Sequence, residues 1–387
     1  MSKNLSKIWL RGLRRLVATS FQLPRVPKAR APASPVRAKA ATKTAKSAVK
    51  PKSGLPKTPV RARAPRESRV RPRASAWAAG KWARSFHSSP PAAGRFINHL
   101  AYALYLPANA AAVGMPLVVM LHGCKQSAEE FAQGTRINLL ADRFGFAVLY
   151  PEQSKTAHAH GCWRWYDDSA DAGAGEAASV ASLVQAIVAQ NDFDAERVYL
   201  AGMSAGAGLA AMLAVKYPSL FAAVGLHSGV VFGDAKSAVG AMDVMRRGSR
   251  NDPIGLIDAA VNVASYPGMP AIIVHGELDS VVSNTNAKQL ATEFLRLNRF
   301  IDAQGAWRAG ERREETQQDG SVFADYVKGG KRVVRTCTVR GLGHAWSGGD
   351  DTVQFHSSRG PDASAMLWEF FKYQRRVQTV LRDETTV

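Results

Sequence analysis

Short apolar runs alternate with helical stretches from about residue 97 onward. The runs lie at 117–123, 146–151, 197–202, 222–229, 271–276 and 332–339. Apolar runs of this length predict strands that are buried on both faces of a parallel sheet. Helices are expected between them, for example over 175–190 and over 205–217, where Pro218 ends the second helix. The alternation predicts an α/β fold with a doubly wound, mostly parallel sheet, in which ligands bind at the carboxyl ends of the strands.

The excess positive charge is confined to the first ninety residues. The 387-residue chain has a formal net charge of +20, yet residues 1–90 hold 23 Lys or Arg against one acid, Glu67. The remainder is close to neutral, so its charge does not favour nucleic-acid binding by the folded part. The first segment is mostly Ala, Pro, Lys, Arg, Ser and Thr, and it cannot bury enough apolar surface to offset chain entropy. We predict a disordered basic tail over 1–90 and one folded domain over 91–387.

Three roles remain open for this tail. It is a solvated spacer, a segment that docks to an anionic surface such as a membrane, a nucleic acid or a storage granule, or an unusual export signal. No segment of the sequence reaches the roughly 18 consecutive apolar residues that a membrane span requires, so no transmembrane segment is expected.

One serine lies among very small side chains. The stretch 202–206, Gly-Met-Ser-Ala-Gly, is a G-x-S-x-G motif that follows a predicted strand and opens a predicted helix. Such a turn holds a nucleophilic serine in a strained backbone conformation, and only small residues leave room for the neighbouring backbone. The motif alone is weak, because a tight helix-packing turn with an incidental serine has the same pattern. Its strand-turn-helix position nevertheless predicts that Ser204 is a nucleophile.

A serine hydroxyl is a poor nucleophile unless a base takes its proton and a third group holds that base. In this type of fold the order along the chain is serine, acid, histidine. His344, in the stretch GLGHAWSGG, lies on a glycine-flanked loop just after the predicted strand 332–339. His356 follows no predicted strand. We therefore predict His344 as the base for Ser204.

The acid is expected between the serine and the histidine in the chain. Asp279 lies just beyond the predicted strand 271–276, where its carboxylate can reach the far nitrogen of the imidazole. Glu277 comes too early in the same turn. Either carboxylate has the alternative role of capping the following helix. We predict Asp279 as the third catalytic residue.

A nucleophilic attack on a carbonyl also needs hydrogen-bond donors for the oxyanion. One is the backbone N–H of Ala205, directly after the serine. The second is expected from the loop in LHGCKQSAEEF, as the backbone N–H of Cys124 or that of Gly123.

These residues together resemble one group of α/β-hydrolases. The group is the poly(3-hydroxybutyrate) depolymerase family of esterases, which includes enzymes similar to feruloyl and acetylxylan esterases. The matching stretches run in the family's order from about residue 100 to 350 and are LHGCKQSAEEFA, VLYPEQ, CWRWYDD, VYLAGMSAGAGLAAMLAVKYP, HGELDSVVSNTNA and GLGHAWSGG. The resemblance implies that 91–387 is a catalytic domain that hydrolyses carboxylic esters through an acyl-enzyme on Ser204, with Asp279 and His344 and without a cofactor.

The sequence departs from the secreted, polymer-degrading members in two respects. No additional domain for binding solid polyester is recognisable after the catalytic one, and a basic tail stands where an export signal is expected. The family is largely secreted, so an extracellular location is implied, but a cytoplasmic one remains open. The expected substrates are polyhydroxybutyrate or its oligomers, or small acyl esters.

The resemblance also bears on the cysteines. The stretches that contain Cys124 and Cys162 face each other in this family, which implies a disulfide that braces the oxyanion loop and forms in an oxidising compartment. Cys337, inside a predicted strand, is expected to be a buried thiol.

Three tryptophans lie in or near these motifs, and we predict that Trp163, Trp165 and Trp346 line a groove for an acyl chain or a polyester. The alternative is that they are core residues. The stretch HAHGC, at 158–162, has spacings that can hold a metal but lacks an evident fourth ligand, so we expect an exposed loop and no metal site.

Two further functions are compatible with the same residues. An acyltransferase uses the same triad and passes the acyl group to an acceptor other than water. A tail-anchored protein that only binds esters has no need of a serine, an acid and a histidine together. The sequence therefore favours hydrolysis.

Overall fold

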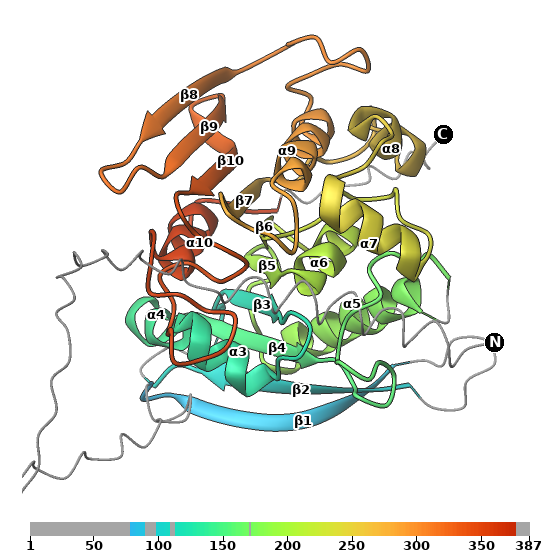
Figure 1. The fold of residues 1–387 in the computed structure, drawn as a ribbon. Coiled ribbons are helices and arrows are strands. Elements are labelled where there is room, and N and C mark those ends of the chain that lie inside the picture. Colours follow the sequence, from blue (N-terminus) through green and yellow to red (C-terminus); the bar gives the residue numbers. More distant parts are fainter. Residues whose placement is uncertain (1–77, 90–97, 109–112, 170–171, 377–387) are drawn as a thin grey trace, which may run out of the picture. The chain divides into compact units, whose positions relative to one another are not determined.

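The computed structural model describes residues 78–89, 98–108, 113–169 and 172–376. Within these ranges ten strands form one sheet, in the order β1-β2-β4-β3-β5-β6-β7-β10-β9-β8 (Figure 1). The strands are β1 (Lys81–Ser89), β2 (Asn98–Leu106), β3 (Leu117–Leu121), β4 (Ala147–Glu152), β5 (Val198–Met203), β6 (Ala223–His227), β7 (Ala271–Gly276), β8 (Glu311–Thr316), β9 (Val322–Lys328) and β10 (Lys331–Val339). The described helices are α3 (Ala128–Thr135), α4 (Ile137–Phe144), α5 (Gly173–Gln190), α6 (Ala205–Lys216), α7 (Ala238–Arg247), α8 (Pro253–Ala260), α9 (Thr285–Leu297) and α10 (Ala363–Phe371).

The centre of the sheet is parallel and its two ends are antiparallel. All neighbouring pairs from β4 to β10 are parallel. The pairs β1–β2, β2–β4, β10–β9 and β9–β8 are antiparallel. All six apolar runs of the sequence coincide with strands of the parallel centre, and the two predicted helices are α5 and α6. The predicted α/β class is confirmed, with a mixed sheet.

The central strands are buried because helices cover both faces of the sheet. Along β3, Val119 contacts the hydrophobic core on the face covered by α5, α6 and α9. Its neighbours Val118 and Met120 contact the core on the other face, which α3, α4 and α10 cover. Since successive side chains of a strand point to opposite faces, continuous apolar runs are what this arrangement requires.

Residues 81–89 belong to the sheet, although their composition placed them in the predicted tail. Strand β1 pairs with β2 along its whole length. Most of its side chains are exposed, so it contains no apolar run. Its side chains also contact the rest of the domain: the ring of Trp82 lies 5.2 Å from that of Tyr150, and Arg84 pairs with Glu152 at 2.9 Å. The boundary at residue 90 therefore lies too late.

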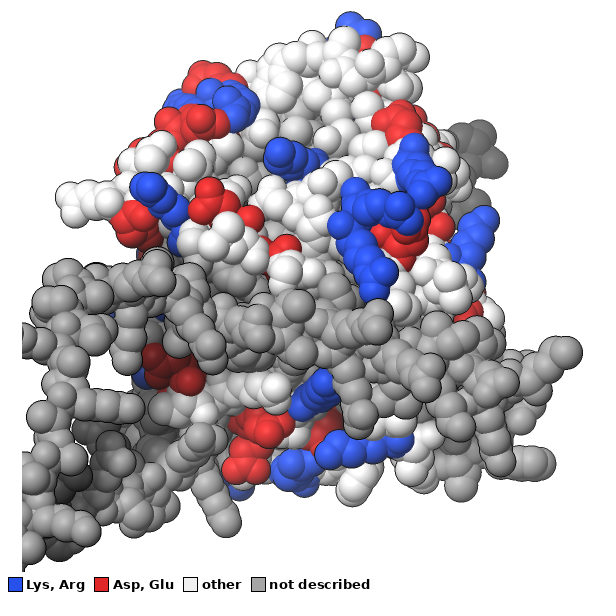
Figure 2. Space-filling model, in the orientation of Figure 1, with Lys and Arg blue, Asp and Glu red and all other residues white. Residues whose placement is uncertain are grey.

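The opposite end of the sheet is charged. Every residue of β8 is exposed, and Arg312 pairs with Glu314 on the strand itself. Charged edge strands resist pairing with other chains. Figure 2 shows basic and acidic side chains interspersed on the face in view, as the near-neutral charge of 91–387 predicts.

Part of the predicted tail, 1–77, lies outside the described residues. Its predicted disorder and its contacts with an anionic surface stay predictions. In the described ranges, no helix has both the length and the apolar character to cross a bilayer.

Candidate active site

Ser204 lies on the sharp turn between β5 and α6, as predicted. Its backbone has φ 56° and ψ −120°, a conformation that few non-glycine residues adopt. A Cβ atom on Gly202 would lie 2.4 Å from the carbonyl carbon of Gly206, and one on Gly206 would lie 2.1 Å from the oxygen of Leu121. Close backbone approach therefore requires both glycines, which explains the small residues around the serine.

Asp279 and His344 are joined by a hydrogen bond. Nδ1 of His344 lies 2.7 Å from Oδ2 of Asp279, whose side chain is fully buried. Oδ1 accepts hydrogen bonds from the backbone N–H groups of Val281 and Val282 at 2.9 and 2.8 Å. Burial alone would raise the pKa of Asp279, but the charge and hydrogen bond of His344 outweigh burial and lower this pKa to about 2. An ionised Asp279 keeps the proton of His344 on Nδ1, which leaves Nε2 free to act as a base.

Ser204 and His344 border the same cavity. This cavity has a volume of about 420 Å³, and we call it the histidine cavity. Within the described ranges no hydrogen bond joins the two side chains. Ser204, Asp279 and His344 follow β5, β7 and β10, so the carboxyl ends of the parallel strands bring them together as the sequence predicts.

The two rival residues lie elsewhere. Glu277 accepts a hydrogen bond from the N–H of Gly341 at 2.9 Å. His356 is buried, and its Nδ1 donates to the carbonyl oxygen of Gln354 at 2.9 Å. Neither side chain borders the histidine cavity.

Two buried histidines near the site were not singled out from the sequence. Nε2 of His275 donates to the carbonyl oxygen of Val282 at 2.8 Å and lies 3.6 Å from Asp279. Nε2 of His227 accepts the N–H of Ser347 at 3.2 Å. Burial lowers the pKa of both imidazoles, that of His227 to about 3, so both are neutral. A signal existed, because His122, His227 and His275 each follow an apolar run and precede Gly or Ser.

The structure distinguishes the two candidates for the second oxyanion donor. The N–H of Gly123 donates to Oε1 of Gln126 at 2.7 Å. Among the described residues, the backbone N–H groups of Cys124 and Ala205 have no acceptor, and both residues lie beside Ser204. The geometry therefore favours Cys124 over Gly123 as the partner of Ala205.

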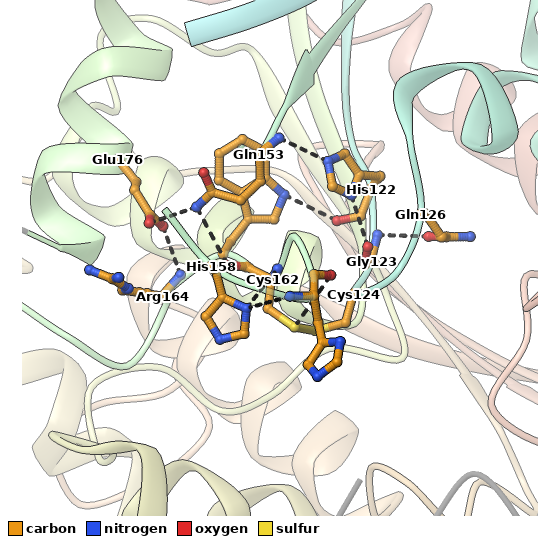
Figure 3. The surroundings of a disulfide bond; sticks show 11 residues. His122, Gly123, Cys124, Gln126, Gln153, His158, Cys162, Arg164 and Glu176 are labelled. Carbon is orange, nitrogen blue, oxygen red and sulfur yellow. Dashed lines mark hydrogen bonds between the residues drawn. A yellow bond between two sulfur atoms is a disulfide. The ribbon is translucent and has the colours of Figure 1, made fainter. Parts of the chain in front are cut away.

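A disulfide and a backbone hydrogen bond join the loop that carries Cys124 to the segment that contains Cys162 (Figure 3). Cys124 and Cys162 form a disulfide, as the resemblance implied. The N–H of Lys125 donates to the carbonyl oxygen of His160 at 2.7 Å, next to that disulfide. Donors held in place before the substrate arrives cost no reorganisation during the reaction.

The buried side chain of His122 holds the same loop through hydrogen bonds. Its Nε2 accepts the backbone N–H of Gln153 at 3.1 Å, so the ring proton is on Nδ1, which donates to the carbonyl oxygen of Gly123 at 2.8 Å. The indole N–H of Trp163 donates to the carbonyl oxygen of His122 at 3.1 Å. Burial lowers the pKa of His122 and keeps the ring neutral. Figure 3 shows His122 beside Gly123, with a dashed line from its ring to Gln153.

Gln153 and Glu176 extend this network behind the disulfide. Oε1 of Glu176 accepts a hydrogen bond from the side chain of Gln153 at 2.6 Å, and Oε2 accepts the N–H of Arg164 at 2.7 Å. Sequence analysis gave neither residue a role. Glu176 lies on α5 outside the matching stretches, and only the fold brings its side chain to Gln153, which precedes it by 23 residues.

The tryptophans divide into two groups. Trp163 and Trp165 border a second cavity of about 300 Å³, which we call the tryptophan cavity and which also reaches Ser204. Trp346 is fully buried in the core, where it stacks on His227, and it borders neither cavity. The prediction that Trp346 contacts substrate is therefore corrected. Proximity in sequence to His344 was misleading because the chain turns inward after that loop.

The remaining predictions concern metals and the third cysteine. Cys162 of the HAHGC stretch is committed to the disulfide, and the described ranges contain no group of three His, Cys, Asp or Glu side chains placed to hold a metal. Cys337 is a buried free thiol, and burial raises its pKa to about 12.

Comparisons with known proteins identify the family and the fold. The sequence profile of the family described as Esterase PHB depolymerase matches residues 100–318. Poly(3-hydroxyalkanoate) depolymerase C from Paucimonas lemoignei is 29% identical over 62% of this chain and 56% of its own length. Feruloyl esterase B from Thermothelomyces thermophilus is 35% identical over 32% of this chain and 42% of its own length.

An acetylxylan esterase gives a third comparison. The probable acetylxylan esterase A from Neosartorya fischeri is 30% identical over 47% of this chain and 51% of its own length. The chain thus spans about half the length of the curated relatives it matches. A solved acetyl xylan esterase from Aspergillus awamori has the same fold, with a TM-score of 0.55, 21% identity and coverage of 74% of this chain and 99% of its own. The profile match covers more than half of the sequence, and the chain belongs to the esterase PHB depolymerase family of α/β-hydrolases.

Proposed function

We propose that this chain is a serine esterase that hydrolyses carboxylic esters through an acyl-enzyme. The observation that carries the proposal is the 2.7 Å hydrogen bond between Asp279 and His344 beside a cavity that Ser204 also borders. Two backbone N–H groups that find no acceptor in the described part of the chain, at Cys124 and Ala205, lie next to the serine and suit a developing oxyanion. Membership of a family of esterases supports the same reaction.

In the first half of the reaction, Nε2 of His344 takes the proton of the Ser204 hydroxyl as Oγ attacks the ester carbonyl carbon. The carbonyl oxygen becomes an oxyanion and accepts hydrogen bonds from the N–H groups of Cys124 and Ala205. The bond between this carbon and the alcohol oxygen then breaks, and Nε2 gives its proton to the leaving alcohol. The acyl group remains bound to Oγ.

In the second half, water replaces the alcohol. Nε2 of His344 takes a proton from the water as its oxygen attacks the acyl carbon. The bond to Oγ breaks, Ser204 recovers its proton from Nε2, and a carboxylic acid leaves. Asp279 remains ionised throughout and stabilises the imidazolium that forms twice in the cycle.

The proposed substrates are hydroxybutyrate oligomers or other esters with a short acyl group. The tryptophan cavity is small and mostly apolar, so it suits a short aliphatic chain. A relative that covers 62% of this chain is named as a poly(3-hydroxyalkanoate) depolymerase, and others are named as esterases for acetyl and feruloyl groups.

The test compares the wild type with Ser204→Ala and His344→Ala on p-nitrophenyl acetate, butyrate and octanoate. Each variant is expected to lose about 10⁴-fold or more in kcat, because the triad acts as a unit. Ser265→Ala, at an exposed serine that borders neither cavity, is the matched control and should retain full activity. A fluorophosphonate probe should label the wild type once and leave Ser204→Ala unlabelled. Equal activity of wild type and Ser204→Ala on all three esters contradicts the proposal.

A further inference from the structure

One fully buried side chain is bound to three separate segments of the chain. Asn286 lies in the first turn of α9 and is inaccessible to solvent. Its Oδ1 accepts the backbone N–H of Val231 at 3.3 Å, and this hydrogen bond fixes which end of the amide is oxygen. Its Nδ2 donates to three backbone carbonyl oxygens, those of Val244 at 2.9 Å, Met245 at 3.2 Å and Ser283 at 3.1 Å. One amide group therefore joins the segment after β6, the last turn of α7 and the turn before α9.

Each of these three segments supplies one residue of the wall of the tryptophan cavity. Val230 precedes Val231, Val282 precedes Ser283, and Met245 is bound directly. We call Val230, Met245 and Val282 the aliphatic wall. The rest of the cavity is bordered by the disulfide, two tryptophans and the turn of the nucleophile. A single side chain thus holds the whole aliphatic wall.

The three carbonyl groups have backbone donors of their own. The N–H of Gly248 donates to the oxygen of Val244 at 2.7 Å, the N–H of Ser283 to that of Met245 at 2.7 Å, and the N–H of Asn286 to that of Ser283 at 2.9 Å. A carbonyl oxygen has two lone pairs, so the side chain of Asn286 adds a second hydrogen bond to each. These carbonyl groups stay hydrogen-bonded without the side chain. Its contribution is therefore to tie α7, which packs against α9, to the turn before α9 (Figure 1).

The tryptophan cavity lies on the acyl side of the nucleophile. His344, which passes a proton to the leaving alcohol in the proposed reaction, borders the histidine cavity and not the tryptophan cavity. Ser204 and Ala205, which bind the acyl carbon and its oxyanion, border the tryptophan cavity. An acyl chain that enters this cavity meets the aliphatic wall, so the position of the wall limits the length of the chain.

The oxyanion side of the cavity is held by other bonds. Cys124 and Cys162 are joined by the disulfide, and the indole N–H of Trp163 donates to the carbonyl oxygen of His122 at 3.1 Å. None of the hydrogen bonds of Asn286 reaches these residues. A change at Asn286 is therefore expected to move the aliphatic wall while the oxyanion donors stay in place.

We propose that Asn286 is a positioning residue that sets the longest acyl chain the enzyme accepts, by holding the aliphatic wall in place. This inference rests on the proposed esterase function and adds to it the residue that controls acyl length. A packed wall rejects extra methylene groups because they have no room. Without the hydrogen bonds of Asn286, α7 and the segment after β6 can move away from α9, and the cavity admits longer chains.

A substitution of nearly the same shape tests the inference. Leucine has the branched shape of asparagine but neither donates nor accepts hydrogen bonds, so Asn286→Leu removes the four contacts and keeps the volume. The measured quantity is the ratio of kcat/KM for p-nitrophenyl octanoate to that for p-nitrophenyl acetate. This ratio is expected to rise about tenfold, which is the effect of roughly one methylene group in an apolar pocket. A lower KM for the octanoate is expected to account for most of the rise.

The matched control is Asn298→Leu, directly after α9. Asn298 is also buried, and its Oδ1 accepts the N–H of Met269 at 2.9 Å. Its Nδ2 donates to the carbonyl oxygens of Met269 at 2.7 Å and Phe294 at 2.8 Å. These three residues lie outside the walls of both cavities. Asn298→Leu should therefore destabilise the fold in urea much as Asn286→Leu does, and leave the ratio of octanoate to acetate hydrolysis unchanged.

Asn286→Ala is the second variant, since the smaller side chain cannot clash with its surroundings, and it should raise the ratio as well. The inference is wrong if the wild type hydrolyses octanoate as efficiently as acetate, or if both Asn286 variants keep the wild-type ratio. It is also wrong if Asn298→Leu raises the ratio equally, as a general loosening of α9 would, or if Asn298→Leu folds and neither Asn286 variant does. The proposed function fails separately, if Ser204→Ala matches the wild type on acetate.

Discussion

The two cavities that meet at Ser204 share part of their walls but differ in chemistry. Met245 and Cys124 border both. The histidine cavity adds a base and two polar side chains, whereas the tryptophan cavity adds indole and aliphatic groups. One side of the serine is thus suited to moving a proton and holding a polar alcohol, and the other to enclosing an apolar acyl group. The difference indicates that the alcohol part and the acyl part of an ester are recognised on opposite sides of the same nucleophile.

The two sides also differ in how they are held. On the histidine side, one hydrogen bond to Asp279 orients the imidazole of His344, and two further hydrogen bonds, Leu278 N–H to the carbonyl oxygen of Leu342 and Gly341 N–H to Glu277, join the loops that follow β7 and β10. The oxyanion loop is fixed by a disulfide and by the network of His122. Substitutions at Asp279 or His344 should therefore lower mainly kcat. Loss of the disulfide should also lower the free energy of unfolding.

The largest effect is expected from breaking the histidine side. Asp279→Asn leaves the shape of the side chain unchanged but stabilises the wrong tautomer of His344, and kcat is expected to fall by about 10⁴-fold. Steady-state kinetics on p-nitrophenyl acetate measure this loss. Glu277→Gln is the matched control, because an amide oxygen can still accept the N–H of Gly341, and its kcat should stay within about twofold. A comparable loss in both variants would assign the effect to the turn and not to the carboxylate.

The disulfide is expected to have the next largest effect. Cys162→Ser opens a covalent loop with a sequence separation of 38, for which the chain-entropy relation gives a loss of about 4 kcal/mol in the free energy of unfolding. Urea denaturation measures the loss. A reducing agent should destabilise the wild type by a similar amount and leave Cys162→Ser unaffected. A reductant effect of equal size in both proteins would show that another thiol is responsible.

The wall between the cavities should control acyl length. Met245 is held through its carbonyl oxygen, which accepts hydrogen bonds from the N–H of Ser283 at 2.7 Å and the side chain of Asn286 at 3.2 Å. Met245→Ala removes the side chain that borders both cavities and is expected to raise the ratio of octanoate to acetate hydrolysis by about tenfold. Met242→Ala, also on α7 but outside both walls, should leave this ratio unchanged. Equal ratios in all three proteins would mean that the cavities do not divide at Met245.

The smallest effect concerns a carboxyl group behind the tryptophan cavity. Glu293 is fully buried, and its Oε2 accepts the N–H of Phe232 at 3.1 Å, near Val230 of the cavity wall. Burial, with a smaller contribution from the charge of Asp234, raises the pKa of Glu293 well above its ordinary 4.5, although the hydrogen bond from Phe232 opposes this shift. The fold therefore favours the neutral form of this carboxyl group more strongly than the unfolded chain does.

The sign of the pH dependence follows from this difference. The unfolded chain releases the proton of Glu293 first, so folding stability falls as the pH rises above the unfolded pKa, by about 1.4 kcal/mol for each unit until the folded pKa is reached. Glu293→Gln removes this slope and is expected to be more stable than the wild type at pH 8 but not at pH 5. Urea denaturation at both values tests this, with exposed Glu315→Gln as the control. If the free energy of unfolding changes with pH in the same way for the wild type and Glu293→Gln, the buried carboxyl group does not have a raised pKa.

Sequence reasoning predicts the parallel centre of the fold well, for a physical reason. Strands buried on both faces must be apolar along their length, and Gly202 and Gly206 are required because a Cβ atom on either would lie only 2.1 to 2.4 Å from neighbouring backbone atoms. These constraints act on residues that are adjacent in the chain, so a short window of sequence contains them. Ser204 and its place in the chain order could be predicted on this basis.

The sheet edges and the support of the oxyanion loop could not be predicted in the same way. β1 and β8 are mostly exposed, so no apolar pattern distinguishes them from loops or tail. The partners of His122, at Gln153 and Trp163, meet only after the sheet has formed. Trp346 shows the converse error, because proximity in sequence to the site did not bring its side chain to the substrate side.

The backbone of Ser204 implies a trade-off between reactivity and thermal robustness. A residue held at φ 56° and ψ −120° stores conformational free energy that the rest of the fold must offset, and glycine would bear this geometry at lower cost. A catalytically dead Ser204→Gly protein should therefore melt at a higher temperature than the active one. Selection for heat resistance alone would then tend to remove the nucleophile, and only a demand for turnover would keep it.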